Sequence, residues 1–312
     1  MKPYAVCDLH CDTLTLTPGG DSLNLPDSAF SLEKLPHDVH WAQCTAIFTP
    51  DELPLGERVP YYEQCRKSFD RQMRKYAAVV SPCRTAADVE RAWKDGKHAA
   101  LLTVENGSVL AGQMARAEIL AWDGVRMIAL TWNGVNEIGS GNVSSDGLTR
   151  FGKELIPEME QLGMIVDVSH LNDSGLHDVF RLARKPFAAS HSNCRSVCGH
   201  LRNLTDSQLR EMFSRRCLVG LNFCINFLKD GGEGAGPDDL LRHIDRMLEL
   251  GGEDSIALGS DFDGTILPDF LPDTTAEAAL PDLLLSRGYG ADFIEKLMYR
   301  NALNFWRANL PG

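Results

Sequence analysis

The chain has 312 residues, of which 44% are apolar and 24% charged, as is typical of a globular protein with a large core. Its formal net charge of −12 argues against non-specific binding to nucleic acid or to anionic membranes, both of which require a basic surface. The sequence has no apolar run that resembles a signal-peptide core or a membrane span, so we predict a cytoplasmic protein.

The nine cysteines are expected to be reduced thiols, because their number is odd and the chain is long enough to fold without disulfides. Cys194 and Cys198 have the spacing of a metal-binding pair. No second Cys/His pair at zinc-finger spacing accompanies them, so ordinary semi-buried thiols are the preferred interpretation.

Short β-branched runs alternate with amphipathic stretches along the chain. Strands are predicted at residues 4–9, 43–48, 99–104, 125–131, 164–168, 187–190, 218–223 and 256–259. Helices are predicted at residues 57–80, 148–163, 205–216 and 236–252, with a final helix at 291–307 that closes the barrel. Eight strands alternating with helices predict an α/β fold, a (β/α)8 TIM-type barrel that forms one domain over residues 1–312.

Acids and histidines follow five of the predicted strands. In chain order they are His10 with Asp12, Glu105, His170, His191, and Asp261 with Asp263. Because active sites of barrels lie at the carboxyl ends of the strands, we expect these side chains to meet in space.

The first strand carries its polar residues at every second position. By strand alternation Asp8, His10 and Asp12 share one face, and the last two can point into the barrel mouth. Cys11 then points toward the helices and is predicted to pack there. The same alternation puts Asp261 and Asp263 on one face, so the spacing alone does not choose between them.

Three histidines and three carboxylates form a mixed nitrogen and oxygen ligand set, which suits zinc or another first-row divalent ion. Such a set exceeds the need of one ion, and two ions about 3.5–4 Å apart, bridged by a carboxylate, would activate a shared water. Taken singly, each histidine could be a hydrogen-bonded structural residue. Five agreeing strand ends favour metal ligands, because buried acids and histidines are costly unless paired or metal-bound.

The stretches that contain these residues resemble the membrane (renal) dipeptidase family, zinc dipeptidases with a metal-dependent barrel of amidohydrolase type. The resemblance runs in order along nearly the whole chain. It includes DLHCDT (8–13), GVRMIALTWN (124–133), GLTRFGKELIPEMEQLGMIVDVSH (147–170), ASHSNCRSVCGHLRNLTD (189–206) and LGSDFDG (258–264).

The resemblance implies a role for each candidate ligand. His10 and Asp12 would bind one zinc ion, and Glu105 would bridge to the second. His170 and His191 would complete the ligands of that second ion. The family also implies a homodimer.

The resemblance also selects Asp261 over Asp263. Asp261 would lie on the side of the first ion and act as general base and later as proton donor to the leaving amine. Arg202 matches the family arginine that holds the C-terminal carboxylate of the substrate. Without the resemblance, a surface arginine after a helix would be the preferred interpretation of Arg202.

The sequence departs from the family at the end of the fourth predicted strand. The best-known members have a histidine there, whereas this chain has Trp132 followed by Asn133. Tryptophan has one N–H donor and no charge, so it cannot replace an acid-base imidazole. Asn133 or Asn136 could supply a donor instead, or an asparagine could cap the loop. The substrate-binding candidates are thus Arg202, Trp132 and Asn133.

Together these residues predict a binuclear zinc dipeptidase that hydrolyses dipeptides with a free C-terminal carboxylate through a metal-bridging hydroxide. Hydrolysis of another small amide, such as an N-acyl amino acid, is the alternative reaction, and a metal-binding barrel with little catalysis is the alternative class. Arg202 favours a substrate with a free carboxylate. The loops at 226–237 and 265–279 are expected to shape the substrate pocket.

Overall fold

The computed structural model describes residues 4–311. The strands are β1 (Tyr4–Cys11), β2 (Val39–Phe48), β3 (Val80–Cys83), β4 (His98–Glu105), β5 (Met127–Ala129), β6 (Ile165–Asp167), β7 (Ala188–Ala189), β8 (Leu218–Leu221) and β9 (Ile256–Leu258). The α-helices are α1 (Leu55–Lys75), α2 (Ala86–Lys94), α3 (Ala115–Asp123), α4 (Arg150–Gln161), α5 (Asp173–Leu182), α6 (Asp206–Ser214), α7 (Ile225–Leu228), α8 (Pro237–Glu249), α9 (Thr274–Ala278), α10 (Leu280–Ser286), α11 (Ala291–Glu295) and α12 (Asn301–Asn309). Two 3-10 turns, η1 (Thr13–Thr15) and η2 (Gly107–Leu110), and a π-helical turn, η3 (Lys296–Arg300), complete the elements.

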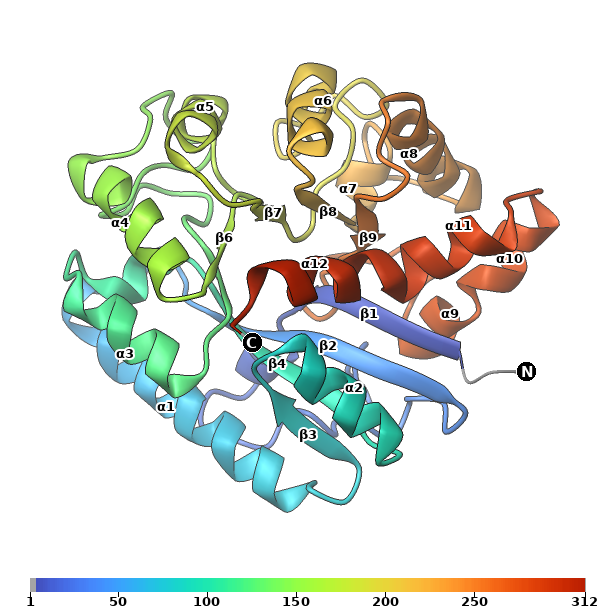
Figure 1. Ribbon diagram of the computed structural model, residues 1–312, viewed down its shortest axis with the longest axis horizontal. Coiled ribbons are helices and arrows are strands. Elements are labelled where there is room, and N and C mark those ends of the chain that lie inside the picture. Colours follow the sequence, from blue (N-terminus) through green and yellow to red (C-terminus); the bar gives the residue numbers. More distant parts are fainter. Residues whose placement is uncertain (1–3, 312) are drawn as a thin grey trace.

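Eight of the strands close into a parallel barrel, with helices around its outside (Figure 1). In ring order they are β1, β2, β4, β5, β6, β7, β8 and β9, and β9 pairs again with β1. The predicted (β/α)8 barrel is confirmed, and each of the eight predicted strands overlaps one of these strands. β1, β2 and β4 extend beyond their predicted ranges. Several are shorter than predicted, since β5, β6 and β9 each span only three residues.

β3 is a ninth strand that the sequence did not predict. A helix is predicted over residues 57–80, but α1 ends at Lys75, and β3 begins at Val80, the last residue of that predicted helix. β3 pairs along the first half of β4, and β5 pairs with the second half of the same edge. Pro82 lies within β3, and a proline is tolerated there because β3 is an edge strand with a single partner.

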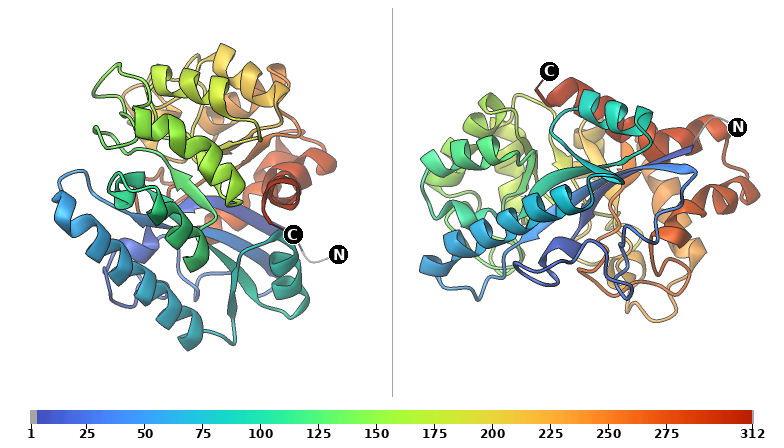
Figure 2. Two further views of the ribbon diagram at one scale, coloured as in Figure 1. Left: turned by 60° about the vertical axis from the view of Figure 1, so that its left-hand side comes forward. Right: turned by 90° about the horizontal axis from the view of Figure 1, so that it is seen from below.

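The amino-terminal end of the barrel is closed by the last helix. Leu303, Phe305 and Trp306 of α12 belong to one buried cluster with Ala5 and Cys7 of β1, among other inward-facing strand residues. Figure 2 shows α12 at one end of the barrel, with the loop after β1 at the other. The predicted helix at 291–307 is confirmed in position, but it extends to residue 309 and contains the π-helical turn η3.

Helix starts follow the capping signals in the sequence. Thr205 caps α6 by accepting from the backbone N–H of Gln208, whose side chain reaches back to the backbone of Thr205. Pro237 is the first residue of α8, where a missing N–H costs no helical bond. These caps fix where the loops at the barrel mouth end and the outer helices begin.

All nine cysteines lie in the described part of the chain, and each is buried as a free thiol. This agrees with the prediction of reduced cysteines. Among residues 4–311, no helix is both long enough and apolar enough to cross a membrane.

Candidate metal centre and active site

The six predicted ligands converge at the carboxyl ends of the barrel strands. Their possible ligand atoms form three overlapping groups, with the atoms of each group within 4.8 Å of one another. The groups are His10, Asp12 and Glu105; Glu105, His170 and His191; and His10, His191 and Asp261. Arrays of buried histidines and carboxylates at this spacing fit divalent first-row metal ions.

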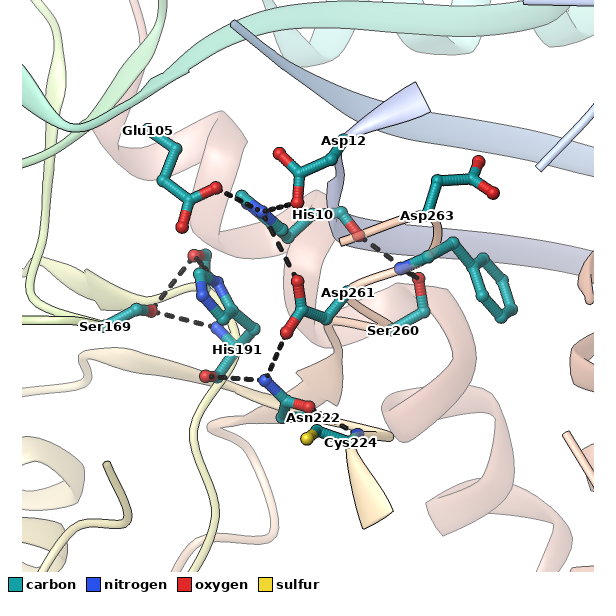
Figure 3. A network of polar contacts seen from close by, with 12 residues as sticks. His10, Asp12, Glu105, Ser169, His191, Asn222, Cys224, Ser260, Asp261 and Asp263 are labelled. Carbon is teal, nitrogen blue, oxygen red and sulfur yellow. Dashed lines mark hydrogen bonds and ion pairs between the residues drawn. The ribbon is translucent and has the colours of Figure 1, made fainter. Parts of the chain in front are cut away.

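Glu105, at the end of β4, joins two of these groups. Its Oε2 lies 3.2 Å from Nε2 of His10, and its Oε1 lies 2.8 Å from Nε2 of His170 (Figure 3 shows Glu105, His10 and Asp12). Nε2 of His170 in turn lies 3.0 Å from Nε2 of His191. One carboxylate thus faces both histidine sets, which is the position that a bridging ligand requires.

Asp8 does not join this site, contrary to the simple alternation along the first strand. The register of β1 against β2 shifts between Asp8 and Cys11. The carboxylate of Asp8 accepts hydrogen bonds from the backbone N–H and hydroxyl of Ser260 and from the backbone N–H of His10. The irregularity breaks the period of two, so Asp8 fixes the backbone beneath the site while His10 and Asp12 enter it. Cys11 is fully buried in the core, as predicted.

Asp261 and Asp263 do not share a face either, because β9 ends at Leu258 and both residues have positive φ, 64° and 65°. Oδ1 of Asp261 lies 3.8 Å from Nε2 of His10. Asp263 turns away from the cluster (Figure 3) and accepts hydrogen bonds from the backbone N–H groups of Ala29 and Phe30. The structure therefore distinguishes Asp261, which lies in the cluster, from Asp263, which does not, whereas the sequence spacing alone could not distinguish them.

Gly264 follows these two acids at a point of very close approach. A Cβ at this position would lie 2.0 Å from Oδ2 of Asp12 and 2.7 Å from Oδ1 of Asp261. Only glycine leaves room for the backbone to pass beside both carboxylates.

Several buried polar residues that the sequence did not single out orient the cluster. The hydroxyl of Ser190 donates to Asp167 and lies 2.7 Å from Nδ1 of His191. Asn222 donates from Nδ2 to Oδ2 of Asp261 at 3.0 Å, and its own oxygen accepts from the backbone N–H of Cys224 (Figure 3). Asn222 falls inside the predicted strand 218–223, and its polarity there is the one signal that could have found it.

Burial and crowding shift the protonation of the cluster. Burial alone would lower the pKa of His10, but the carboxylates of Asp12 and Glu105 outweigh it and hold that pKa well above its usual value. Burial, with Arg202 and His10 nearby, holds the pKa of His170 well below its usual value. Burial also raises the pKa values of Glu105 and Asp261, with Asp12 adding to both. This buried excess of negative charge favours cations.

Three buried atoms in the cluster support the same conclusion. Nε2 of His10, Oδ1 of Asp12 and Oε2 of Glu105 make no hydrogen bond of good geometry among residues 4–311, although the first and the last lie 3.2 Å apart as a possible ion pair. Orphaned polar atoms are costly in a protein interior unless a ligand satisfies them. The residues present thus fit a divalent metal centre.

Arg202 lies beside this cluster and is not the surface residue that its sequence position alone would suggest. It is 6% exposed, and Nε, Nη1 and Nη2 have no hydrogen-bond partner in the described part of the chain. Its guanidinium lies 5.4 Å from the ring centroid of Phe227. Arg202 lines a cavity of about 420 Å³ together with four of the acids, Asp12, Glu105, Asp261 and Asp263. The guanidinium therefore faces the space above the cluster.

Trp132 and Asn133 line the same cavity. The rings of Trp132 and His170 are 6.3 Å apart, and the amide oxygen of Asn133 lies 3.2 Å from Nδ1 of His170. Asn136 is different, because its amide nitrogen donates within the protein, to Asn106 and to the carbonyl of Leu130. Asn136 therefore acts as a loop cap.

The loops at 226–237 and 265–279 lie where the sequence predicted. Phe227 and Thr265 line the cavity, and an adjoining hollow of about 830 Å³ is bordered by Asn226, Gly231 and Ile266. The short helices α7 and α9 fall at or within these segments.

Comparison with known proteins identifies relatives over most of the chain. A protein from Klebsiella pneumoniae described as an uncharacterized protein in the pqqA 5' region is 37% identical over an alignment of 240 residues, and the match covers 72% of this chain and 89% of that protein. The crystal structure of dipeptidase AC, a metallopeptidase of family M19, has a TM-score of 0.93 at 27% identity and covers 99% of this chain and 100% of its own.

A metallopeptidase from Rhodobacter sphaeroides, solved with a phosphinate mimic of the dipeptide L-Ala-D-Ala, has a TM-score of 0.92 at 25% identity. The match covers 98% of this chain and 99% of that one. Residues 1–310 match the sequence model of one family, described as membrane dipeptidase (peptidase family M19). The chain belongs to this family and is a metal-dependent hydrolase.

Proposed function

We propose that this protein is a dipeptidase with two divalent metal ions, and that its substrates carry a free C-terminal carboxylate. The observation that carries the proposal is the buried guanidinium of Arg202, which faces the same cavity as the metal ligands and has no protein partner among the described residues. A buried cation without an anion is costly, so a substrate carboxylate is the natural partner.

The metal ions would be held by His10, Asp12, Glu105, His170 and His191, with Glu105 shared between them. Zinc suits these ligands, and other first-row divalent ions share the preference. When bound, such ions lower the pKa of a coordinated water and polarise the scissile carbonyl.

Asp261 is the residue of this chain that we assign to proton transfer. Its carboxylate lies at the cavity wall beside His10, and Asn222 holds one of its oxygens while the other faces the cluster. Burial raises its pKa, which makes it a better base than an exposed aspartate. Asp261 would accept a proton from the attacking water and deliver it to the leaving amine.

Arg202 would position the substrate. Its planar fork can hold both oxygens of a carboxylate, which fixes the C-terminal residue above β7 and β8 and leaves the peptide carbonyl over the metal cluster. The relative solved with a phosphinate mimic of L-Ala-D-Ala supports a dipeptide of this form.

The test is hydrolysis of L,L and L,D dipeptides by the metal-loaded protein, with C-terminally amidated dipeptides and N-acyl amino acids for comparison. We expect cleavage of the free acids, loss on amidation, and a raised KM in Arg202→Met. Cleavage of N-acyl amino acids alone would favour the alternative reaction, and no cleavage by fully loaded protein would favour a binding role. The homodimer and the cytoplasmic location stay predictions from the sequence.

A further inference from the structure

The cavity has an aromatic wall, formed by Trp132 and Phe48, which the catalytic assignment leaves without a role. We propose that this wall binds the side chain of the N-terminal residue of the substrate, so that dipeptides beginning with an aromatic or large aliphatic residue are preferred. The inference rests on the proposed dipeptidase activity and names the substrate class of the same site.

The position of the wall in the ring sets which end of the substrate reaches it. Phe48 ends β2, beside Glu105 on β4, and Trp132 follows β5. Arg202 and Phe227 lie after β7 and β8, which are across the ring from β2 and β4 (Figure 1). A substrate held by its carboxylate at Arg202, with its carbonyl over the central cluster, must extend its N-terminal residue toward β2, β4 and β5.

The wall is apolar. The rings of Trp132 and Phe48 meet edge to face, with centroids 5.1 Å apart and planes at 65°. Leu16 and Pro50 are further apolar residues that line the cavity. Aromatic rings prefer such an arrangement, and a third ring or a branched aliphatic side chain can pack against both.

Hydrogen bonds between three loops hold the wall in place. Asp51 lies three residues after Phe48, and Gly134 lies two residues after Trp132. One oxygen of Asp51 accepts a hydrogen bond from the backbone N–H of Gly134 at 2.6 Å. The other oxygen of Asp51 accepts a hydrogen bond at 2.9 Å from Nδ2 of Asn106, the residue that directly follows Glu105. The loops after β2, β4 and β5 are thus fastened to one another, so the two rings form a preformed surface.

The surroundings of Arg202 are different. The hollow on that side is lined by Asn133, Asn226 and Thr265 beside the guanidinium, together with Phe227 and the exposed Ile266. A side chain on the C-terminal residue would meet this mixed and more polar lining, which lacks a second aromatic wall. The cavity therefore selects strongly at the N-terminal residue of the substrate and weakly at the C-terminal one.

The experiment compares two dipeptide series, X-Ala and Ala-X, where X is Ala, Leu, Phe, Ser or Asp. We expect kcat/KM for Phe-Ala and Leu-Ala to exceed that for Ser-Ala by about tenfold or more, as an apolar pocket of this kind can discriminate. Within the Ala-X series the spread should stay smaller. An equal or larger spread in the Ala-X series would overturn the inference.

Variants then assign the selectivity to the wall. Trp132→Ala and Phe48→Ala should each lower kcat/KM for Phe-Ala about tenfold or more relative to Ala-Ala, whereas Trp132→Phe should retain most of the preference. Trp122→Ala is the matched control, since Trp122 is 83% exposed on α3 and lies outside the cavity lining. Equal losses on Phe-Ala and Ala-Ala would overturn the inference.

The outcomes also separate this inference from the proposed function. If wild-type protein cleaves dipeptides but its kcat/KM does not depend on the first side chain, the dipeptidase assignment is kept and the inference about the aromatic wall fails. If only N-acyl amino acids are cleaved and Trp132→Ala affects the acyl chain, both the dipeptidase and the N-terminal-residue assignment fail.

Discussion

The hydroxyl of Ser190 lies 2.7 Å from Nδ1 of His191 and donates to Oδ2 of Asp167. Because its proton is committed to the carboxylate, the hydroxyl can only accept from Nδ1–H of His191. This fixes the imidazole tautomer that presents a lone pair at Nε2, the atom that faces His170. Asp167, Ser190 and His191 thus form a hydrogen-bonded relay that orients the imidazole proposed as a metal ligand.

Removing the relay should weaken metal binding. Ser190→Ala leaves Nδ1 of His191 without its acceptor, and loss of such a supporting hydrogen bond typically lowers metal affinity about 10–100-fold. Competition with a chromophoric chelator measures the change. Ser192→Ala is the control, because the buried hydroxyl of Ser192 has no hydrogen-bond partner among residues 4–311. Equal affinities in Ser190→Ala and wild type would show that the relay is not needed.

Asp261 and Asp263 should differ in what their loss does. Asp261→Asn should lower kcat about 10²–10⁴-fold with metal content largely kept, as expected for a general base. Asp263→Asn should instead lower the free energy of unfolding by about 1–3 kcal/mol, since backbone N–H groups of Ala29 and Phe30 lose a charged acceptor. Single-turnover rates and denaturant melts distinguish the two, and full activity in Asp261→Asn would remove the base assignment.

The fold and the convergence of the six candidate ligands could be predicted because both depend on patterns that a sequence shows. Strand and helix periods alternate along the chain, and the acids and histidines fall directly after apolar runs. His10 and Glu105 are conspicuous for this reason, since a charged or titratable group at the end of a buried strand needs a partner.

What failed depends on local backbone geometry. The irregular register of β1 turned Asp8 away from the face that the period of two assigns to it, and positive φ angles separated Asp261 from Asp263. A β-bulge has no reliable sequence signal. A left-handed backbone conformation is most often signalled by glycine, and an aspartate at such a position does not identify it. Ser190 and Asn222 were missed because a polar residue near a strand end looks the same whether it caps a loop or orients a ligand.

Metal removal should destabilise the protein, because the proposed ions would satisfy buried carboxylates that otherwise repel one another. We expect about two ions per chain by elemental analysis, a lower Tm after chelation, and recovery on reloading. Glu105→Gln should reduce the number of bound ions below two, whereas Glu52→Gln at the exposed cavity rim should not change it.

Metal must displace protons from carboxyls with raised pKa values, so the apparent metal affinity should fall as the pH falls. One ion per chain in wild type would contradict the shared role of Glu105.

Glu277 on α9 offers a test of stability that is separate from the metal. Its side chain is fully buried, and neither carboxylate oxygen has a hydrogen-bond partner among residues 4–311. Burial, and then the charge of Asp8, raises the pKa of Glu277 well above its usual value. The folded protein therefore holds a proton on Glu277 at pH values where the unfolded chain has lost it.

The sign of the pH dependence follows from this difference. A carboxyl whose pKa is raised by folding contributes its stability below the unfolded pKa of about 4.5, and that contribution is lost as the pH rises toward the folded pKa. While one extra proton is bound to the folded state, the free energy of unfolding falls by about 1.4 kcal/mol per pH unit. Glu277→Gln has no proton to lose, so its free energy of unfolding should fall less steeply with pH.

Urea melts of wild type and Glu277→Gln at pH 5 and pH 8, both with saturating metal, measure the contrast. We expect the free energy of unfolding of Glu277→Gln to increase relative to that of wild type as the pH rises. At pH 8 the variant should be the more stable protein, because it no longer buries an ionisable carboxyl. The comparison between the two proteins at each pH cancels the titration of the metal ligands, which they share. A difference in stability that does not change with pH would mean that Glu277 has the same pKa in the folded and unfolded chains.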